Sequence, residues 1–544
     1  MPKSYRVLTA VFALWLLVWI YLSWPMMQDD AFIHLRYAVN LLQHHMISYG
    51  GVHPDYGTSS LLYVWLLAAV RCFSKSPVMP RALSSLFHLL LFAGLAWEFP
   101  KALGKAPRLA WSFALLLLGT LVTPMAVRWL DDGMETSLTL GLVALLAVSV
   151  SRLGHEEVLR KRSMVWLAIL GFLATLARVE YLLLLGVVSL TLFFERYELR
   201  GADVGPNPDL SPEWHPAGES EAEEVSEYPR IRAEQAAVCG LPLAGSLLAA
   251  GLIYLTMRAL LPDTAVAKAN AQIPWADKLG VALGVLKAGA SVFVSSMSVG
   301  IVLLIFWLLT LVAVVVYRRR FSLSILTANS LFPVVLTLAM ERGQQIQGVR
   351  YFLWTLVFPV LWNTLELRWY PAEPSASIAR ALRVATYGIA GFLLVLMPVE
   401  SILLSREFRT REQSLAEFRA QHLERLYSLN LVAFDVGYIG YFTGSSVCDM
   451  AGLVNGRARS LMPFEQRVAL CAAEHPEYAF VSGFSLSELR HAMSLKGWSV
   501  CGVYDFANLR ASDPHYLIAS PQATAAVCEA AGNAPRPIET MLGP

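Results

Sequence analysis

The chain has 544 residues, of which 56% are hydrophobic and only 15% are charged, and its formal net charge is +2. Soluble globular proteins carry about 25% charged residues, so this composition excludes an ordinary soluble enzyme. The chain also lacks a basic run with interleaved aromatic residues, which argues against nucleic acid as a partner.

The apolar stretches predict an α-helical polytopic membrane protein, because about 18 apolar residues with few charges suffice to cross a bilayer. The first stretch is expected to be a retained helix and not a signal peptide, since its apolar run is too long and lacks a small-x-small cleavage site. We expect about 11 crossings, at residues 7–27, 80–99, 108–125, 134–152, 164–178, 180–195, 236–257, 291–317, 322–340, 351–368 and 380–404.

Two segments decide the topology. A further crossing at the apolar segment 58–74 would place Arg160-Lys161-Arg162 and Arg318-Arg319-Arg320 outside, against the positive-inside rule. We therefore predict that 58–74 does not cross. The stretch 164–195 is too long for one straight span and has charged residues in its middle, so it predicts two helices that meet at the outer surface. This topology leaves the C-terminus outside.

The composition divides the chain into a membrane part, residues 1–404, and a soluble part, residues 405–544. Residues 28–79 are expected to form an outer loop with interfacial helices. Residues 196–235, rich in Pro, Glu, Asp and Ser, predict a disordered cytoplasmic insert. The soluble part predicts an extracytoplasmic α/β domain, with short strands at Leu431-Val-Ala-Phe, Tyr478-Ala-Phe-Val, Ser499-Val-Cys-Gly-Val and Tyr516-Leu-Ile-Ala.

Four of the six cysteines, Cys448, Cys471, Cys501 and Cys528, fall in this soluble part. In an oxidising compartment they would form disulfides in one of three pairings that the sequence does not distinguish. Four free buried thiols are the alternative.

The first outer loop begins with the carboxylate pair Asp29-Asp30, directly after a predicted span. Charges at the bilayer edge are costly without a partner or a task. One of the two could cap an interfacial helix over about 31–45, on which Asp29, Ile33, Arg36 and Asn40 would share one face. Capping accounts for one carboxylate but not for the pair, so we favour a function.

A second acidic cluster, Asp131-Asp132-Gly-Met-Glu135, follows the third span and is predicted to lie on the same face. Its alternative role is again an N-cap. The predicted outer-face cations are few and include Arg178, Lys268 and Arg350. Arg and Lys at this depth suit a phosphate group, although they could also extend to lipid headgroups.

Carboxylates and cations together are what glycosyl transfer from a lipid phosphate requires. A carboxylate accepts the proton of the acceptor hydroxyl, and cations stabilise the departing phosphate. No Walker-type or Gly-rich phosphate loop is present, and no soluble nucleotide sugar is expected outside. The pattern therefore favours a donor delivered by the membrane.

The motif Asp29-Asp30-Ala-Phe-Ile followed by Arg36-Tyr37-Ala-x-Asn40 resembles the first loop of GT-C membrane glycosyltransferases. It is most similar to that of actinobacterial arabinofuranosyltransferases that use decaprenyl-phosphate arabinose. The sequence departs from these relatives at Asp55-Tyr56-Gly57, where they often read Glu-Gly-Tyr, and at Asn455, which replaces a common Asp. Further matching motifs are Tyr56-Gly-Thr58-Ser59, Gly133-Met-Glu135-Thr136, Arg178-x-Glu180, Pro262-Asp263-Thr264 with Lys268, Gly348-x-Arg350-Tyr351, Asp435-x-Gly437-Tyr438-Ile439-Gly440-Tyr441 and Asp449-Met-Ala-Gly452-Leu453.

The resemblance implies a GT-C-type bundle in a bacterial inner membrane and catalysis by a first-loop aspartate. Asp29 would be the base, and Asp30 would orient it or help to bind a divalent cation. Glu135 joins them as a candidate catalytic carboxylate, and Arg350, Lys268 and Arg178 would bind the donor phosphate. No other cofactor is indicated. Candidate substrate-binding residues are Arg36, Tyr37, Asn40, Tyr56, Thr58, Asp132 and Tyr351.

The predicted function is transfer of a sugar, arabinofuranose or another pentose, from a polyprenyl-phosphate donor to an envelope glycan, lipid or protein. An O-antigen polymerase or ligase is the first alternative, although such enzymes usually depend on outer-loop arginines and lack the Asp pair. A lipid-linked-sugar flippase or transporter would place ionisable residues at mid-membrane and show repeated halves. An adhesion or sensor protein would not need so many polar residues in its short outer loops.

Overall fold

The structure of the chain is a computed structural model. It describes residues 3–182 except 25, 52, 105–107 and 154–160, then residues 240–267, 376–506 and 514–539, with scattered positions in 184–189 and 308–365. The predicted insert 196–235 and most of the predicted spans 291–317, 322–340 and 351–368 lie outside these residues.

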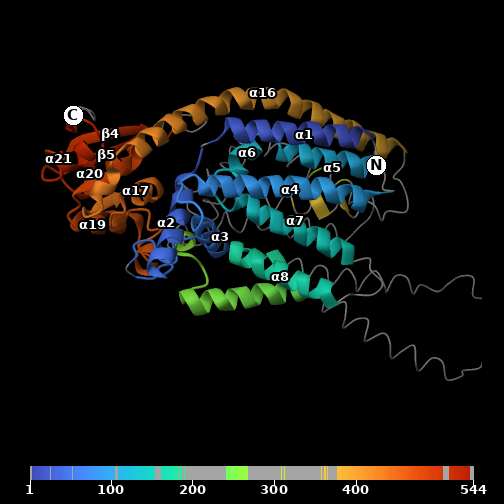
Figure 1. Cartoon of the computed structure of the whole chain (residues 1–544), viewed down its shortest axis with the longest axis horizontal. Helices are drawn as coiled ribbons and strands as arrows, with labels where there is room; N and C mark the ends of the chain where they lie inside the picture. Colours follow the sequence, from blue (N-terminus) through green and yellow to red (C-terminus); the bar gives the residue numbers. More distant parts are fainter. Residues whose placement is uncertain are drawn as a thin grey trace, which may run out of the picture.

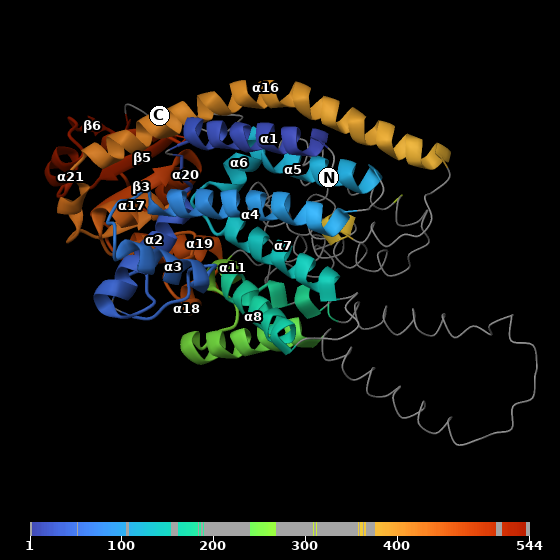
Figure 2. The same cartoon turned by 45° about the vertical axis from the view of Figure 1, so that its right-hand side comes forward.

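The described chain is an elongated helical bundle with a β-sheet at one end (Figure 1). The N-terminus lies at the far end of the bundle, and the helices run side by side along the long axis (Figures 1 and 2). The long helices are α1 (Lys3–Leu22), α4 (Met79–Leu103), α5 (Arg108–Leu121), α7 (Thr136–Leu153), α8 (Lys161–Ala177), the helix Gly240–Met257 and α16 (Ala376–Ala420).

Several of these helices are apolar and long enough to span a membrane, as predicted. Within the described residues there are four: Ser4–Leu22, Met79–Leu103, Gly240–Met257 and Arg380–Ala420. A fifth would be α5 together with α6 (Pro124–Leu130), which meet at a bend of 66°. The count of 11 extends over residues that are not described and stays a prediction.

The bend between α5 and α6 divides the predicted span 108–125. Pro124 disfavours a helical conformation at Thr123 and lacks the N–H that a continuous helix would need. Thr123 instead caps the new helix, because its hydroxyl accepts the Ala126 N–H at 3.2 Å. A proline at the start of α6 thus turns the chain where the sequence pattern suggested one straight helix.

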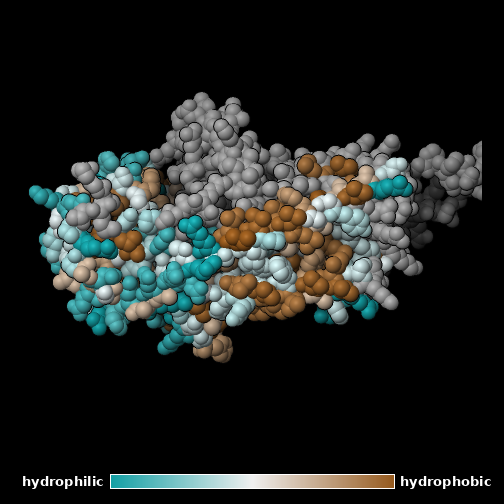
Figure 3. Space-filling view, turned by 90° about the horizontal axis from the view of Figure 1, so that it is seen from above, coloured by the Kyte–Doolittle hydropathy of each residue, from teal (hydrophilic) through white to brown (hydrophobic). Residues whose placement is uncertain are grey.

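The exposed side chains of α16 change from apolar to charged along the helix. Its exposed side chains are apolar from Val384 to Leu403, and the next ones are Arg406 and Arg409. Twenty helical residues extend about 30 Å, which is the thickness of a hydrocarbon core. Seen from the side of α16, apolar surface covers the bundle and polar surface covers the sheet end (Figure 3). The helix itself continues without a break through the predicted boundary at residue 404.

Short helices lie between the bundle and the sheet (Figures 1 and 2). They are α2 (Asp29–His44), α3 (Leu61–Arg71) and α11 (Asp263–Ala267). The 11 residues of α3 extend about 16 Å, about half of what a crossing needs, so this helix is too short to span a membrane by itself. The predicted break within 164–195 is also present, because α8 ends at Ala177 and a turn holds Arg178 and Glu180.

The C-terminal sheet has six strands in the order β2-β1-β3-β5-β4-β6. Strand β1 is parallel to both β2 and β3, and the remaining pairs are antiparallel. All four predicted strands are present, while β2 and β6 were not predicted. The bounds are β1 Leu431–Ala433, β2 Val447–Asp449, β3 Tyr478–Ser482, β4 Ser499–Asp505, β5 Pro514–Ala519 and β6 Arg536–Pro537.

Helices cover both faces of this sheet. Consecutive side chains of a strand point to opposite faces, and those of β1 and β3 are buried on both. Phe480 packs with Phe418 near the end of α16, while its neighbour Val481 belongs to the core beneath α19 and α20. Each face also has a disulfide: Cys448–Cys471 joins β2 to α19, and Cys501–Cys528 joins β4 to α21. The helices are α17 (Val436–Thr443), α19 (Phe464–Ala473), α20 (Gly483–Ala492) and α21 (Thr524–Ala530), with α18 (Arg457–Ser460) and the 3-10 turn Leu423–Leu426.

Candidate functional site

The side chain of Asp29 connects the bundle to the sheet. Asp29 lies in the first turn of α2, and its two carboxylate oxygens accept the backbone N–H groups of Gly437 (2.8 Å) and Tyr438 (2.7 Å). These amides lie in the first turn of α17, where a helix has no acceptors of its own and favours negative charge. Asp29 therefore caps α17, and the alternative in which it caps its own helix is wrong, since Gln28 occupies that position.

Arg36, two turns further along α2, contacts the opposite end of α17. Its guanidinium donates to the carbonyls of Gly440 (3.2 Å) and Gly444 (3.1 Å), and also to that of Tyr49 (3.2 Å). A cation at carbonyls in the last turn complements the helix dipole, as an anion does at the first turn. We call these contacts of Asp29 and Arg36 the α2–α17 clamp.

Glycines let the two helices approach this closely. A Cβ atom on Gly437 would lie 1.8 Å from the carbonyl oxygen of Asp29, and one on Gly440 would lie 1.8 Å from the hydroxyl of Tyr49. Neither position could hold a larger residue without separating α17 from the outer loop. The glycines of the Asp435-x-Gly437-Tyr438-Ile439-Gly440 motif thus serve the contact between the two parts of the chain.

The carboxyl group of Asp29 has an unusual acidity. Burial raises its pKa to about 8, and the nearby charges of Asp435 and Asp30 act in the same direction. The two N–H groups of α17 lower the pKa but do not offset burial. A general base works best when its pKa is near the operating pH, and each carboxylate oxygen retains a second lone pair. The geometry is therefore compatible with the predicted base.

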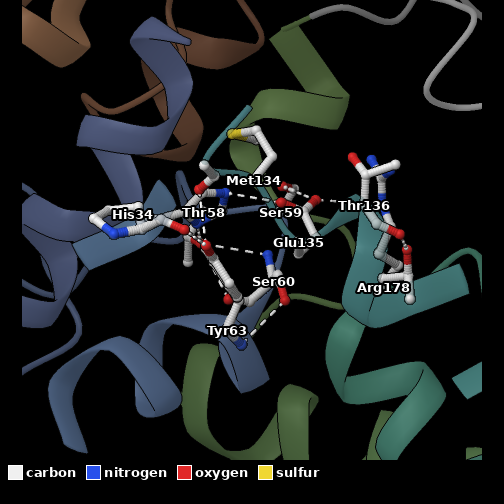
Figure 4. A network of polar contacts seen from close by, with 12 residues as sticks. His34, Thr58, Ser59, Ser60, Tyr63, Met134, Glu135, Thr136 and Arg178 are labelled. Carbon is white, nitrogen blue, oxygen red and sulfur yellow. Dashed lines mark hydrogen bonds and ion pairs between the residues drawn. The ribbon is translucent and has the colours of Figure 1, made fainter. Parts of the chain in front are cut away.

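Glu135 is buried at the centre of a second network of polar contacts (Figure 4). Its Oε1 accepts the hydroxyl of Ser59 at 2.9 Å, and its Oε2 lies 3.2 Å from Nε2 of His34. The other ring nitrogen of His34 lies 2.7 Å from the hydroxyl of Thr58. The network thus joins α2, the loop before α3 and the turn before α7.

Arg178 joins the same network from the end of α8 (Figure 4). Its Nε lies 3.6 Å from Glu135 and 2.8 Å from Glu180. Arg178 and Glu135 are buried, whereas Glu180 is 22% exposed. Arg178, which the sequence predicted to bind a phosphate, is therefore held between two carboxylates, and that of Glu180 is partly exposed to solvent.

The two aspartates before Glu135 have separate partners. Asp131 is fully buried and lies 3.2 Å from Nδ1 of His88 on α4. Asp132 is buried too, and its carboxylate accepts the Met134 N–H at 3.0 Å while its carbonyl accepts the Gln28 N–H at 2.9 Å. Asp132 thus shapes the turn before α7 and holds the chain just ahead of Asp29.

Tyr56 and Asp263 join the outer loop to α11. The Asp263 N–H donates to the Tyr56 carbonyl at 2.6 Å, and the Tyr56 N–H donates to the Asp263 carboxylate at 3.3 Å. Arg457, in the C-terminal part, lies 3.7 Å from the same carboxylate. This is a second link between the two parts of the chain, and it leads directly into the segment that contains Lys268.

Tyr37 and Asn40 bind backbone and side-chain groups of the first loop. The buried hydroxyl of Tyr37 donates to Asp55 and accepts the Gly57 N–H at 2.8 Å. The amide of Asn40 donates to two carbonyls, those of Ser48 (2.9 Å) and Tyr49 (2.7 Å). Both side chains shape the loop, and a contact with substrate stays a prediction for them.

The structure brings most of the predicted residues to one end of the bundle, next to the sheet. Asp29, Asp30, Arg36, Tyr37 and Asn40 come from α2; Tyr56 and Thr58 from the next loop; Asp132 and Glu135 from the turn before α7; Arg178 from the end of α8. Lys268, Arg350 and Tyr351 lie outside the described residues.

Two residues that contact Glu135, His34 and Ser59, were not among the predicted site residues. His34 stands five positions after Asp29, on a different face of the same helix, and Ser59 follows Thr58 within a quoted motif. A helical wheel of α2 would have placed His34 away from Arg36, toward another partner. Among the residues that the structure describes, no three His, Cys, Asp or Glu side chains are grouped as metal ligands.

Comparisons with known proteins bear on the two parts differently. A family model described as a domain of unknown function, DUF8728, matches residues 405–523. No curated protein matches the sequence. The structure is similar to a crystal structure of ArnT from Cupriavidus metallidurans bound to undecaprenyl phosphate. The TM-score is 0.51 at 13% sequence identity, over 95% of this chain and 98% of that one.

A second crystal structure, ArnT from the same organism in the apo state, gives a TM-score of 0.39 at 12% identity, over 94% and 98% of the two chains. At such identities only the fold is comparable. The first likeness extends over nearly all of both chains. The chain therefore has the fold of ArnT, a GT-C glycosyltransferase.

Proposed function

We propose that this protein transfers a sugar from a polyprenyl-phosphate donor to an acceptor at the outer face of a bacterial inner membrane. The observation that carries the proposal is the gathering of Asp29, Asp30, Glu135 and Arg178 at one end of a GT-C bundle. ArnT, whose fold the chain shares, has been crystallised with undecaprenyl phosphate. A lipid phosphate reaching this end between helices would meet these three carboxylates and a cation.

Two features support the outer placement of that end. Both disulfides lie in the C-terminal sheet next to the site, and disulfides form in oxidising compartments. Basic residues lie at the opposite end of the bundle, where Lys101 and Arg152 flank Glu98 at the ends of α4 and α7. Positive residues in short loops mark the cytoplasmic side.

The proposed step is a direct displacement. The acceptor hydroxyl oxygen bonds to the anomeric carbon, the bond from that carbon to the phosphate oxygen breaks, and the hydroxyl proton passes to Asp29. Polyprenyl phosphate leaves as an anion, stabilised by Arg178 together with Lys268 and Arg350. Arg178 would exchange part of its contact with Glu180 for the phosphate, since Glu180 is its partly exposed partner.

The identities of the donor sugar and of the acceptor are inferred from the motif resemblance alone. It favours arabinofuranose or another pentose as the donor sugar, and an envelope glycan, lipid or protein as acceptor. Asp30 is half-exposed beside Asp29 and would orient the base or contribute to a divalent-cation site.

The test is a reconstituted assay. Purified protein in lipid nanodiscs is incubated with a panel of polyprenyl-phosphate pentoses and hexoses and with envelope oligosaccharides, and release of polyprenyl phosphate is measured. We expect turnover of one donor, and the same donor should accumulate in cells that lack the gene. If no lipid-phosphate sugar is consumed and none accumulates, the proposed function is wrong.

A further inference from the structure

The parallel part of the C-terminal sheet has a topology that creates a binding place. Strand β1 is flanked by β2 on one side and β3 on the other, both parallel to it. After β1 the chain passes through α17 to β2 on one side of β1, and it then returns through α19 to β3 on the other side. The helices α17 and α19 lie on opposite faces of the sheet. In such sheets, ligands bind outside the carboxyl ends of the strands where the order reverses. Here these are the ends of β1 and β3.

A carboxylate with a histidine partner lies at this position. Asp435 follows the end of β1, and its Oδ2 lies 2.6 Å from Nε2 of His515 on β5. Asp435 is the N-cap residue of α17 but makes no side-chain capping bond. Asp is among the preferred capping residues, yet Asp29 has taken that role. The carboxylate of Asp435 is 36% exposed and is oriented by a histidine that is 5% exposed.

The same strand ends face the proposed catalytic residue. The first turn of α17, directly after Asp435, holds Asp29, and the charge of Asp435 acts on the Asp29 carboxyl group. A ligand bound by Asp435 would therefore lie beside the proposed base. This proximity distinguishes the strand ends from a remote surface site.

Aromatic rings complete the surface at these ends. Phe434 follows β1, and Phe484 follows β3 at the start of α20. Phe464 begins α19, and its ring stacks on Phe484 with centroids 6.0 Å apart. Phe434 packs edge-on against both. Phe484 is 61% exposed, although a large aromatic side chain gains free energy by burial. Phe484 packs on Phe434, the residue before Asp435, so an exposed ring and an oriented carboxylate follow the ends of two adjacent strands. Together they match the two surfaces of a sugar, its apolar C–H face and its hydroxyl edge.

We propose that the carboxyl ends of β1 and β3 form a binding subsite for the saccharide acceptor, with Asp435 accepting its hydroxyl groups and Phe484 packing against a sugar ring. His515 is a positioning residue that fixes Asp435. This inference rests on the proposed function, since it identifies the acceptor as a saccharide and states which part of the chain recognises it. The soluble sheet would then present the acceptor to the membrane-bound donor.

The experiment compares variants of the full-length protein in nanodiscs, with neutral pentose and hexose oligosaccharides as acceptor probes. Phe484→Ala removes an exposed ring and should not affect folding. We expect about a tenfold or greater rise in acceptor KM for this variant and for Asp435→Asn, since each loses about one strong contact. Donor affinity should stay unchanged. His515→Gln, which can still donate to Asp435, should keep more of the acceptor affinity than His515→Ala.

Matched controls are Tyr427→Ala, which removes another exposed ring, and Glu474→Gln, which alters a carboxylate of the same domain that pairs with Arg459. Both should leave acceptor KM unchanged. An acceptor KM within about twofold of wild type in Phe484→Ala and in Asp435→Asn would overturn the subsite. Failure of the proposed function is distinct, because the wild-type protein would then consume no lipid-phosphate donor at all. Direct calorimetric titration of the oligosaccharides reports the subsite without turnover.

Discussion

The outer end of the bundle contains two Asp-Asp pairs that look alike in sequence but lie in different surroundings. Asp29 and Asp30 are half-exposed at the start of α2, and Asp29 binds amides of α17 more than 400 residues away. Asp131 and Asp132 are fully buried; one faces His88 on α4, and the other closes the turn before α7. Only the first pair lies between the two parts of the chain.

The difference shows how burial assigns roles to identical residues. A buried carboxylate with fixed partners stabilises a turn or an ion pair, and access to a substrate would require breaking those contacts. A half-buried carboxylate with a raised pKa can exchange protons with a bound molecule. We therefore assign the catalytic role to the first pair and a structural role to the second. Glu135 and Arg178 combine buried structural contacts with a proposed part in the reaction.

The largest effect is expected from Asp29→Asn. A positioned carboxylate contributes about 10² to 10⁴-fold to proton transfer, so turnover should fall by that factor in the reconstituted assay. The substitution should also weaken the contact with α17, because the new amide N–H₂ group would face the N–H of Gly437 or Tyr438 and cannot accept it.

Arg36→Gln is the matched control, since it weakens the other end of the α2–α17 clamp and leaves the Asp29 carboxylate in place. Turnover in Arg36→Gln should fall much less than in Asp29→Asn. Equal losses in the two variants at equal stability would mean that Asp29 serves the clamp alone.

Glu135→Ala should cause the largest loss of stability. It leaves buried Arg178 without one of its two carboxylate partners and His34 without its carboxylate partner, and breaking a buried pair costs about 3–5 kcal/mol. Chemical denaturation in detergent measures this. Glu98→Gln, at the opposite and more exposed end, should cost only about 0–1 kcal/mol. A loss as small as this in Glu135→Ala would contradict the structural role of the network.

Gly437→Ala should separate α17 from α2. The added Cβ would meet the Asp29 carbonyl at 1.8 Å, and overpacking of this kind costs about 1–3 kcal/mol. Gly483→Ala, in the first turn of α20, is the control because its Cβ would meet no atom within 4 Å. Denaturation midpoints of the two variants compare the sites directly, and equal midpoints would exclude the close approach.

The smallest effect concerns pH. Because the pKa of Asp29 is raised to about 8, its carboxyl group should hold a proton at neutral pH, and turnover should rise with pH up to about 8. The folded state binds this proton between about pH 4 and 8 while the unfolded chain does not, so stability should fall as pH rises through that range.

Asp435→Asn removes a neighbouring negative charge and should shift the rise in turnover to lower pH. A pH–rate profile of both proteins checks the direction of the shift. An unchanged profile would mean that Asp435 and Asp29 do not interact.

Local sequence patterns predicted much of this architecture because they depend on nearby residues. Apolar length predicted the helices, charge in the middle of 164–195 predicted the break at Arg178, and alternation predicted β1, β3, β4 and β5. The motifs predicted that Asp29, Glu135 and Arg178 belong to one functional end. Strand β2 was missed because its apolar residues Val447 and Cys448 are followed at once by Asp449, whereas β1 lies in a run of four apolar residues. Pro124 turned a predicted single span into a bent pair.

What only the tertiary structure decided is which partner each charged residue has. The sequence offered Asp29 as a base or as a cap of its own helix, and the fold brings it to the amides of a helix that follows 400 residues later. It placed Arg36 among candidate substrate ligands, whereas the guanidinium lies against the carbonyls that end that same helix. It left three disulfide pairings open, and the sheet selects two bonds on opposite faces. Hydropathy and propensity act over a few residues, while hydrogen bonds and ion pairs form between whatever groups the packed chain brings within about 3 Å.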